Sequence, residues 1–281
     1  MQSVPLIFDG ALLARRLAAA RGPLFLNAEF EAALIDRLDD VTREFETAAL
    51  LGESEINDKV RHHSKIKNLS PSHALSIPQS YDLIISCWEL GFINDVPGYL
   101  AQIKNALRPD GWFLAVFYGG ETLIELRHAL WQADEEILGG VTPRVAPMID
   151  LRDAAGLLQR AGFALPVADY EIITVHYNDM FALMRELRGV GLNNMLAERR
   201  KDFTPKKYFL RAAEIYAEKF GQPNGKIPAT VEIISLSAWA PAAVQQKPMI
   251  PGTATQRLAD ALDATEYKLP LVTLNELPFS D

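Results

Sequence analysis

Two compact apolar runs separated by an amphipathic segment form the clearest pattern in the chain. Residues 81–86 (YDLIIS) and 112–117 (WFLAVF) are almost continuously apolar, which is typical of strands buried on both faces of a sheet. Between them, residues 96–107 carry apolar side chains at helical spacing, and Arg-Pro-Asp-Gly at 108–111 is a strong helix breaker. The pattern therefore predicts a strand–helix–strand unit with parallel strands.

The residues before this unit predict two helices and a first strand. We expect one helix over 10–21, with Asp9 as its N-cap, and a second over 28–41, where apolar residues recur at helical spacing. The apolar run at 48–51 is expected to be the first buried strand of the sheet.

The residues after this unit continue the alternation of helices and strands. Helices are predicted over 122–137 and 150–163, the latter with Asp150 as its N-cap. Apolar and polar residues alternate in 171–177 and 230–239, which favours half-exposed strands at an antiparallel edge of the sheet.

We interpret the chain as a single α/β domain with a mostly parallel sheet. A helical insertion rich in Arg, Lys, Glu and Met separates the last two strands, and we expect it to form a lid. The end of the chain is Pro-rich, with one short helix expected over 254–264. The predicted parts are N-terminal helices at 1–44, a sheet core at 45–177 and 228–240, the lid at 178–227 and an irregular tail at 241–281.

Composition narrows the class of protein. The chain has 281 residues, 49% of them hydrophobic, and a net charge of −8, which argues against a nucleic-acid partner. We find neither an apolar run long enough to span a membrane nor a secretory cleavage pattern near the N-terminus, so we expect a mature soluble protein. The single cysteine, Cys87, excludes an intramolecular disulfide and fits a reducing compartment.

The first predicted strand runs into a turn with one glycine. Residues 47–55 read TAALLGESE, whereas turns that bind phosphates or nucleotides use several glycines because the backbone must approach the ligand. Carboxylates at Glu53 and Glu55 would repel a phosphate, although not the sulfonium of S-adenosylmethionine. A lone glycine of this kind more often serves a structural turn.

The segment after this turn is also short. Residues 52–80 number 29, whereas two helices, two strands and their connections need roughly 50 residues. We therefore expect about one strand and one helix to be missing. No part of 56–80 has the pattern of a buried strand followed by Asp or Glu, the acid that would bind a ribose.

Three long stretches of the chain match a known family. The chain resembles the class I S-adenosylmethionine-dependent methyltransferase-like family of respiratory complex I assembly factor 5 in YDLIISCWELGFINDVPGYLAQIKNALRPDGWFLAVFYGGETLIELRHAL (81–130), GGVTPRVAPMIDLRDAAGLLQRAGFALPVADYEIITVHYNDMFALMRELRGVG (139–191) and IPATVEIISLSAWAP (227–241). It is more distantly similar to the malonyl-carrier-protein methyltransferase of biotin synthesis. The resemblance implies a seven-stranded sheet that binds the cofactor at the carboxyl ends of its first strands. It also implies a mitochondrial relative that hydroxylates an arginine in a complex I subunit.

The departures from the family are concentrated in the cofactor half. The family's turn Asp-Leu-Gly-x-Gly-x-Gly is replaced at 50–56 by Leu-Leu-Gly-Glu-Ser-Glu-Ile. The family's Leu-His-Trp-Val-Asn-Asp reads Leu-Gly-Phe-Ile-Asn-Asp at 90–95, and its Phe-Asp-Arg reads Phe-Asp-Gly at 8–10. This pattern indicates a divergent or cofactor-less member.

The candidate site residues form two groups. The cofactor-side group follows two central strands, where open α/β sheets bind ligands, and consists of Leu51, Gly52, Glu53, Ser86, Cys87 and Trp88. Helix–sheet packing is an alternative explanation for the last three. The resemblance implies a substrate-side group, namely Glu121, Arg144, His176 and Tyr177. The last three are expected to line a pocket under the lid, whereas Glu121 is either a substrate-facing acid or part of a structural glycine turn.

Other polar residues have simpler interpretations. Asn94 and Asp95 suit a helix N-cap, and His62 and His63 lack a cysteine or carboxylate at ligand spacing, so we predict no metal site. The basic residues at 199–201 and 206–207 are interpreted as the solvated face of a helix rather than a docking patch for an acidic partner.

Two functions stay open. We favour a divergent or cofactor-less member, a pseudoenzyme that acts in protein binding or respiratory complex assembly. The alternative is an active S-adenosylmethionine-dependent enzyme, either a methyltransferase or a protein-arginine hydroxylase, with a rebuilt cofactor loop. Either protein would act on a protein or carrier-protein partner, associate peripherally with a respiratory complex, and work in the bacterial cytoplasm or the mitochondrial matrix.

Overall fold

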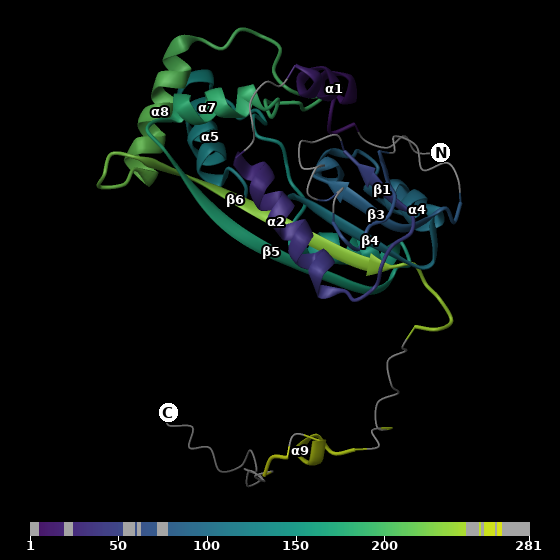
Figure 1. Cartoon of the computed structure of the whole chain (residues 1–281). Coiled ribbons are helices and arrows are strands. Elements are labelled where there is room, and N and C mark those ends of the chain that lie inside the picture. The colour runs from purple at the N-terminus through teal and green to yellow at the C-terminus, as the bar shows by residue number, and fades with distance from the viewer. Residues whose placement is uncertain are drawn as a thin grey trace, which may run out of the picture. The chain divides into compact units, whose positions relative to one another are not determined.

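The structure, a computed structural model, describes residues 6–19, 25–52, 60, 63–71, 78–245, 253, 256–261 and 263–265. The chain divides into two units, Met1–Ala243 and Val244–Asp281, and each is described by itself. In the second unit the described residues include the short helix α9 (Leu258–Ala261), within the span where the sequence predicts one. The first unit contains a sheet flanked by helices (Figure 1).

Six strands in the described residues form one mixed sheet in the order β2-β1-β3-β4-β6-β5. They are β1 (Ala48–Leu51), β2 (Leu69–Pro71), β3 (Tyr81–Cys87), β4 (Leu107–Tyr118), β5 (Ala164–Tyr177) and β6 (Ile227–Trp239). The first four strands in this order are parallel, whereas β6 runs antiparallel to both β4 and β5. The predicted mostly parallel sheet with an antiparallel edge is confirmed.

Strand β2 lies within 56–80, where the sequence pattern did not indicate a buried strand. It pairs in parallel with β1, with Leu69 opposite Ala48. Three residues are too few to display a period of two, and Pro71 at the end of the strand is typical of a sheet edge, so the sequence pattern gave no signal. The seventh strand that the resemblance implies is not found among the described residues.

The Arg-Pro-Asp-Gly segment at 108–111 ends helix α4 (Val96–Ala106) as predicted, but it belongs to strand β4 rather than to a loop. Asp110 takes a left-handed φ of 63°. Its backbone N–H donates to the carbonyl oxygen of Ala240 at 3.1 Å, and Arg43 donates to its carboxylate at 2.9 Å. These contacts allow the strand to begin before the predicted residue 112.

Strands β5 and β6 also begin earlier than predicted, before residues 171 and 230. Pro166 and Pro228 interrupt the alternation of apolar and polar residues in their first halves. The pairing register shifts between Ala164 and Val167, next to the first of these prolines. Strand β5 is at the edge of the sheet, and β6 at Pro228 is paired with β5 but not with β4, because the register of β4 and β6 ends at Ile233. At both prolines one side of the strand needs no partner, so the missing N–H is tolerated.

Helices cover both faces of the sheet. Helix α2 (Phe25–Asp40) packs on one face in a cluster of buried side chains that also contains Val60 and Ile66. Helices α4 and α6 (Leu151–Arg160) pack on the other face. Val60 and Ile66 lie within 52–80, the segment that the sequence predicted to be shortened, so this segment still contributes to the core.

The predicted helix N-caps are confirmed. The carboxylate of Asp9 accepts the backbone N–H of Leu12 at the start of α1 (Gly10–Ala18). The carboxylate of Asp150 accepts the N–H groups of Arg152 and Asp153 at the start of α6. Both caps satisfy N–H groups that have no partner within their helix.

The insertion predicted to be a helical lid contains α7 (Met180–Gly189) and α8 (Lys206–Phe220). These helices pack with α5 (Ile124–Leu138) around a third cluster of buried side chains, which includes Leu126, Met180 and Tyr208. The three helices gather at one end of the sheet (Figure 1). The carboxyl ends of β4 and β5 lie there, and open α/β sheets place ligand sites at that edge.

Candidate functional site

The cofactor-side candidates meet at the carboxyl ends of β1 and β3, which we call the cofactor corner. Leu51 lies opposite Ser86 in the register of the two strands. Gly52 follows with a φ of 87°, and a Cβ atom there would lie 2.5 Å from the carbonyl oxygen of Cys87. The close approach of the two strand ends therefore requires a glycine. Glu53 lies outside the described residues.

The side chains of the cofactor corner are packed into the core. Leu51, Ser86 and Cys87 are almost fully buried, and Trp88 is 8% exposed. Burial raises the pKa of the Cys87 thiol to about 12, with a smaller contribution from Glu89, so the thiol is protonated and unreactive at neutral pH. The Trp88 backbone is left-handed, with a φ of 48°. Its indole Nε1 is buried without a hydrogen-bond partner among the described residues.

In the part of the chain that the structure describes, the cofactor corner supplies few of the groups that hold a nucleotide cofactor. Such cofactors use several glycines after the first strand and an acid after the second. Here Gly52 is needed for its approach to β3, and Ser72 and His73 follow β2 in the sequence instead of an acid. Residues 53–59, the rest of the turn, lie outside the described ranges.

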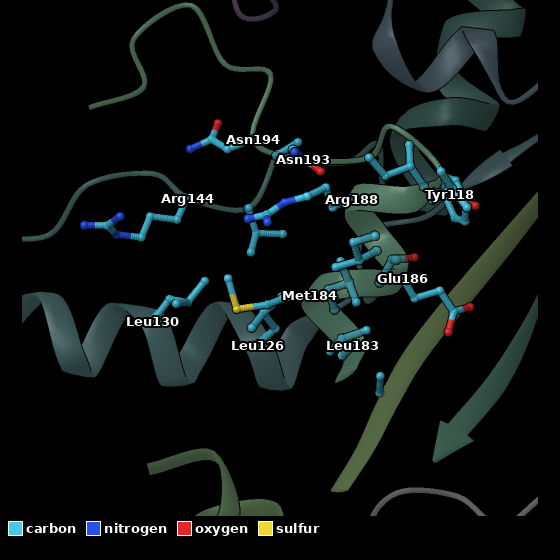
Figure 2. A pocket seen from close by; sticks show the side chains of 18 of the residues that line it. Tyr118, Leu126, Leu130, Arg144, Leu183, Met184, Glu186, Arg188, Asn193 and Asn194 are labelled. Carbon is cyan, nitrogen blue, oxygen red and sulfur yellow. The ribbon is translucent and has the colours of Figure 1, made fainter. Parts of the chain in front are cut away.

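A pocket of about 260 Å³ lies against α7, and we call it the α7 pocket (Figure 2). Its walls come from α5, α7, the carboxyl end of β4 and the first part of β6. Apolar side chains form most of the described lining, among them Leu126, Leu130, Leu183 and Met184. None of the cofactor-side candidates belongs to this lining.

Arg144, a substrate-side candidate, is held at the pocket wall by a buried ion pair. Its Nη2 and Nε lie 2.8 and 2.9 Å from the carboxylate of Asp134, which is fully buried on α5. Its guanidinium also lies over the ring of Tyr208, 4.2 Å from the ring centroid. Thr142 donates two further hydrogen bonds to Asp134. Sequence reasoning missed Asp134, because one acid in a helix gives no signal of its buried partner.

Two tyrosines and a carboxylate also line the α7 pocket. Tyr177, another substrate-side candidate, lies with Tyr118 and with Glu186 of α7. Burial raises the pKa of both tyrosines, and the negative charge of Glu186 raises each of them further. Both phenols are therefore neutral at physiological pH. The Tyr118 hydroxyl is buried and has no hydrogen-bond partner within the described ranges.

Three polar residues at the end of α7 and after it complete the lining, and sequence reasoning did not single them out. Figure 2 shows Arg188 reaching from α7 toward the side of the pocket where Asn193 and Arg144 lie. Asn194 donates to the carbonyl oxygen of Pro143 at 3.1 Å. The Oδ1 atom of Asn193 is buried, with no hydrogen-bond partner in the described part of the chain.

The structure does not bring Glu121 and His176 to this pocket. Glu121 is exposed, and its backbone N–H donates to Oε2 of the buried Glu232 at 2.8 Å. His176 is exposed on β5, with its Nε2 3.0 Å from Nε2 of Gln222. Successive residues of a strand point to opposite faces, so His176 points away from the side on which Tyr177 lines the pocket. Of the four substrate-side candidates, Arg144 and Tyr177 therefore share the pocket.

Asp95 has the capping role that the sequence indicated, whereas Asn94 has a different structural role. The Asp95 carboxylate accepts the backbone N–H of Gly98 at 2.9 Å and caps α4. The Asn94 Oδ1 atom accepts the N–H groups of Ile7 and Phe8, each at 2.8 Å, and so fixes the segment before α1.

The candidate histidines and basic residues are accounted for in part. His63 lies 3.3 Å from the carboxylate of Asp39, whereas His62 falls outside the described residues. The prediction that 199–201 lie on a helix is wrong, because these residues precede α8, which begins at Lys206. Arg199 forms an ion pair of 3.0 Å with Asp9. The described ranges hold no group of side chains arranged to bind a metal, and no helix in them is long and apolar enough to cross a membrane.

Comparison with known proteins finds sequence relatives that are named either arginine-hydroxylases or O-methyltransferases. The chain is 31% identical over 262 residues to the mitochondrial arginine-hydroxylase NDUFAF5 of Rattus norvegicus, and the match covers 84% of this chain and 76% of that protein. It is 42% identical over 190 residues to the Dictyostelium discoideum protein of the same name, over 67% of this chain but only 43% of that protein. It is 38% identical over 162 residues to the malonyl-[acyl-carrier protein] O-methyltransferase of Xylella fastidiosa, over 58% of this chain and 52% of that protein.

No protein-family model matches the chain. Among solved structures, it is similar to the YcgJ protein of Bacillus subtilis, with 10% identity and a TM-score of 0.45, over 76% of this chain and 100% of that chain.

Proposed function

The chain belongs to the class I methyltransferase-like family that includes the mitochondrial arginine-hydroxylase NDUFAF5, and we propose that it binds a segment of a protein partner in the α7 pocket without using S-adenosylmethionine. In this proposal the protein acts in the assembly of a respiratory complex, in the bacterial cytoplasm or the mitochondrial matrix. The observation that carries it is the contrast between the charged and polar groups lining the α7 pocket and the single glycine and buried side chains of the cofactor corner.

Arg144 and Arg188 line the α7 pocket as well as Glu186, but the charge of Arg144 is paired with Asp134 and Arg188 is exposed, so Glu186 is the charged group that favours a basic side chain as the bound group. Glu186 supplies a carboxylate, and the Tyr118 hydroxyl and Asn193 Oδ1 are buried hydrogen-bonding atoms without partners in the described ranges. A guanidinium presents five N–H donors, and a carboxylate inside an apolar wall binds it strongly. The relatives named arginine-hydroxylases support an arginine of the partner as this group.

Titration calorimetry with S-adenosylmethionine tests the cofactor-less part of the proposal. We expect no saturable heat, because the cofactor corner has one glycine and buried side chains. Micromolar saturable binding would instead favour the second candidate, an active S-adenosylmethionine-dependent methyltransferase or arginine hydroxylase with a rebuilt turn at 53–59. The 31% identity with arginine-hydroxylases over most of both chains is the observation that supports this candidate.

Peptide binding tests the pocket itself. We expect an arginine-containing peptide of a respiratory complex subunit to bind at least tenfold more tightly than the same peptide with citrulline, which keeps the shape but loses the charge. Glu186→Gln should remove most of this difference. The matched control, Glu135→Gln, changes an exposed acid of α5 that is not part of the pocket lining and should leave it unchanged. Equal affinity for the two peptides would contradict the assignment of the pocket.

A further inference from the structure

The segment between α7 and α8 presents an exposed aromatic ring between two pairs of basic residues. Phe203 is 87% exposed, and the basic pairs at 200–201 and 206–207 on either side of it are exposed as well. Asp202 is the only acid in this segment and lies 3.7 Å from Arg200. The segment 200–207 therefore has a net charge of +3 in a chain whose net charge is −8.

Two features of this segment oppose folding stability. A phenylalanine left in water contributes nothing to the hydrophobic core. Lys206 and Lys207 occupy the first two positions of α8, where the positive end of the helix dipole disfavours cations, and the first turn contains no acid. Residues that break local stability rules without a structural gain are expected at functional sites.

The segment is nevertheless fixed to the wall of the α7 pocket. Tyr208 is fully buried, and its hydroxyl donates to the carbonyl oxygen of Leu130 at 2.9 Å. Arg144 lies over the Tyr208 ring and donates to the hydroxyl of Thr204 at 3.4 Å. The exposed ring and its flanking cations are thus held in place by buried contacts on both sides of Pro205.

We propose that residues 200–207 form a docking surface for an anionic phospholipid membrane. The two basic pairs attract acidic headgroups, and the phenyl ring between them enters the boundary between headgroups and acyl chains. An acidic protein would be attracted by the same charges, but it would not require an aromatic ring exposed to 87%. Because this segment adjoins the α7 pocket, docking places the pocket beside the membrane surface.

Co-sedimentation of the full chain with lipid vesicles tests this surface. We expect binding to vesicles of phosphatidylcholine with 30% phosphatidylglycerol, weaker binding as salt rises, and almost none to pure phosphatidylcholine. Each basic residue near an anionic surface contributes about fivefold in affinity, so the double substitution Lys206→Glu and Lys207→Glu should lower binding by more than tenfold. Phe203→Ser should lower it severalfold at unchanged charge.

The matched control is Lys219→Glu, which reverses an exposed lysine at the other end of α8 and should leave vesicle binding unchanged. Circular dichroism of each variant establishes that it is folded. Equal binding to neutral and anionic vesicles would overturn the proposal. So would binding that falls on charge reversal but not in Phe203→Ser, because that outcome assigns the surface to an acidic protein instead.

Discussion

The cofactor corner and the α7 pocket lie along the same edge of one sheet, but they are built from different side chains. In the described part of the corner Leu51, Cys87 and Trp88 are buried, and Gly52 is needed for contact between two strands. The pocket has a carboxylate, two phenols, two amides and two guanidinium groups in a mostly apolar lining. Both places hold buried polar atoms without a partner among the described residues, Ser86 Oγ and Trp88 Nε1 in the corner and the Tyr118 hydroxyl and Asn193 Oδ1 in the pocket, so the two differ mainly in the carboxylate of Glu186 and in the surrounding cavity.

The largest effect is expected at the wall of the α7 pocket, in Asp134→Asn. The substitution leaves Arg144 largely buried beside a neutral side chain, and breaking a buried ion pair in this way lowers the free energy of unfolding by about 3–5 kcal/mol. Denaturant unfolding measures the loss. Asp202→Asn removes a surface ion pair of 3.7 Å and should change the free energy by less than about 0.5 kcal/mol. Equal effects would mean that the pocket wall is not built around this pair.

The second-largest effect is expected at Gly52, and it distinguishes a glycine that the fold requires from one that a cofactor requires. Gly52→Ala forces a residue with a side chain into a positive φ and brings its Cβ atom against the Cys87 carbonyl, so we expect a loss of about 3 kcal/mol without any cofactor present. Gly139→Ala meets a similar φ of 69° but has no neighbouring atom within 4 Å, and should cost about 1 kcal/mol. If Gly52→Ala left the free energy of unfolding unchanged, the glycine would be explained by a ligand rather than by strand contact.

The burial of Cys87 in the cofactor corner predicts that the free energy of unfolding falls at alkaline pH. Burial raises the pKa of Cys87 from 9.0 to about 12, so the folded protein holds this proton at pH values where the unfolded chain releases it. The contribution of this group to stability is therefore complete below about pH 9 and is lost as pH rises toward 12, by up to about 1.4 kcal/mol per pH unit. Unfolding curves of the wild type and Cys87→Ala between pH 8 and 10.5 measure it. Parallel losses in both proteins would show that the corner admits water.

The elements of the fold were predictable where the side-chain pattern is strong. The strand at 81–87, the helix that follows it and the antiparallel pair at the edge were each indicated by periodicity. Strand β2 was missed because three residues carry no period, and the early starts of β5 and β6 were hidden by prolines. Pairing with a neighbouring strand determines such segments, and pairing is not visible in a single stretch of sequence.

The candidate site was less predictable than the fold. Arg144 and Tyr177 were found through the resemblance, but the same reasoning also selected His176, which alternation along β5 turns away from the pocket. Asp134 and Tyr118 gave no signal, because their importance depends on what lies beside them after folding. Composition and spacing indicate side-chain chemistry, whereas burial without a partner is a property of the folded chain.

The smallest effect has the opposite sign and is expected for Tyr118→Phe in the α7 pocket. The Tyr118 hydroxyl is buried without a partner among the described residues, so removing it should raise the free energy of unfolding by about 0.5–1 kcal/mol. The same change at Tyr208 removes a hydroxyl that donates to Leu130, and should lower the free energy by about 1 kcal/mol.

If the Tyr118 hydroxyl serves a ligand, Tyr118→Phe should also weaken binding of the arginine peptide severalfold while the protein becomes more stable. A variant that lost stability and kept its affinity would show that this hydroxyl serves the fold, and the difference between pocket and corner would then rest on Glu186 and Asn193.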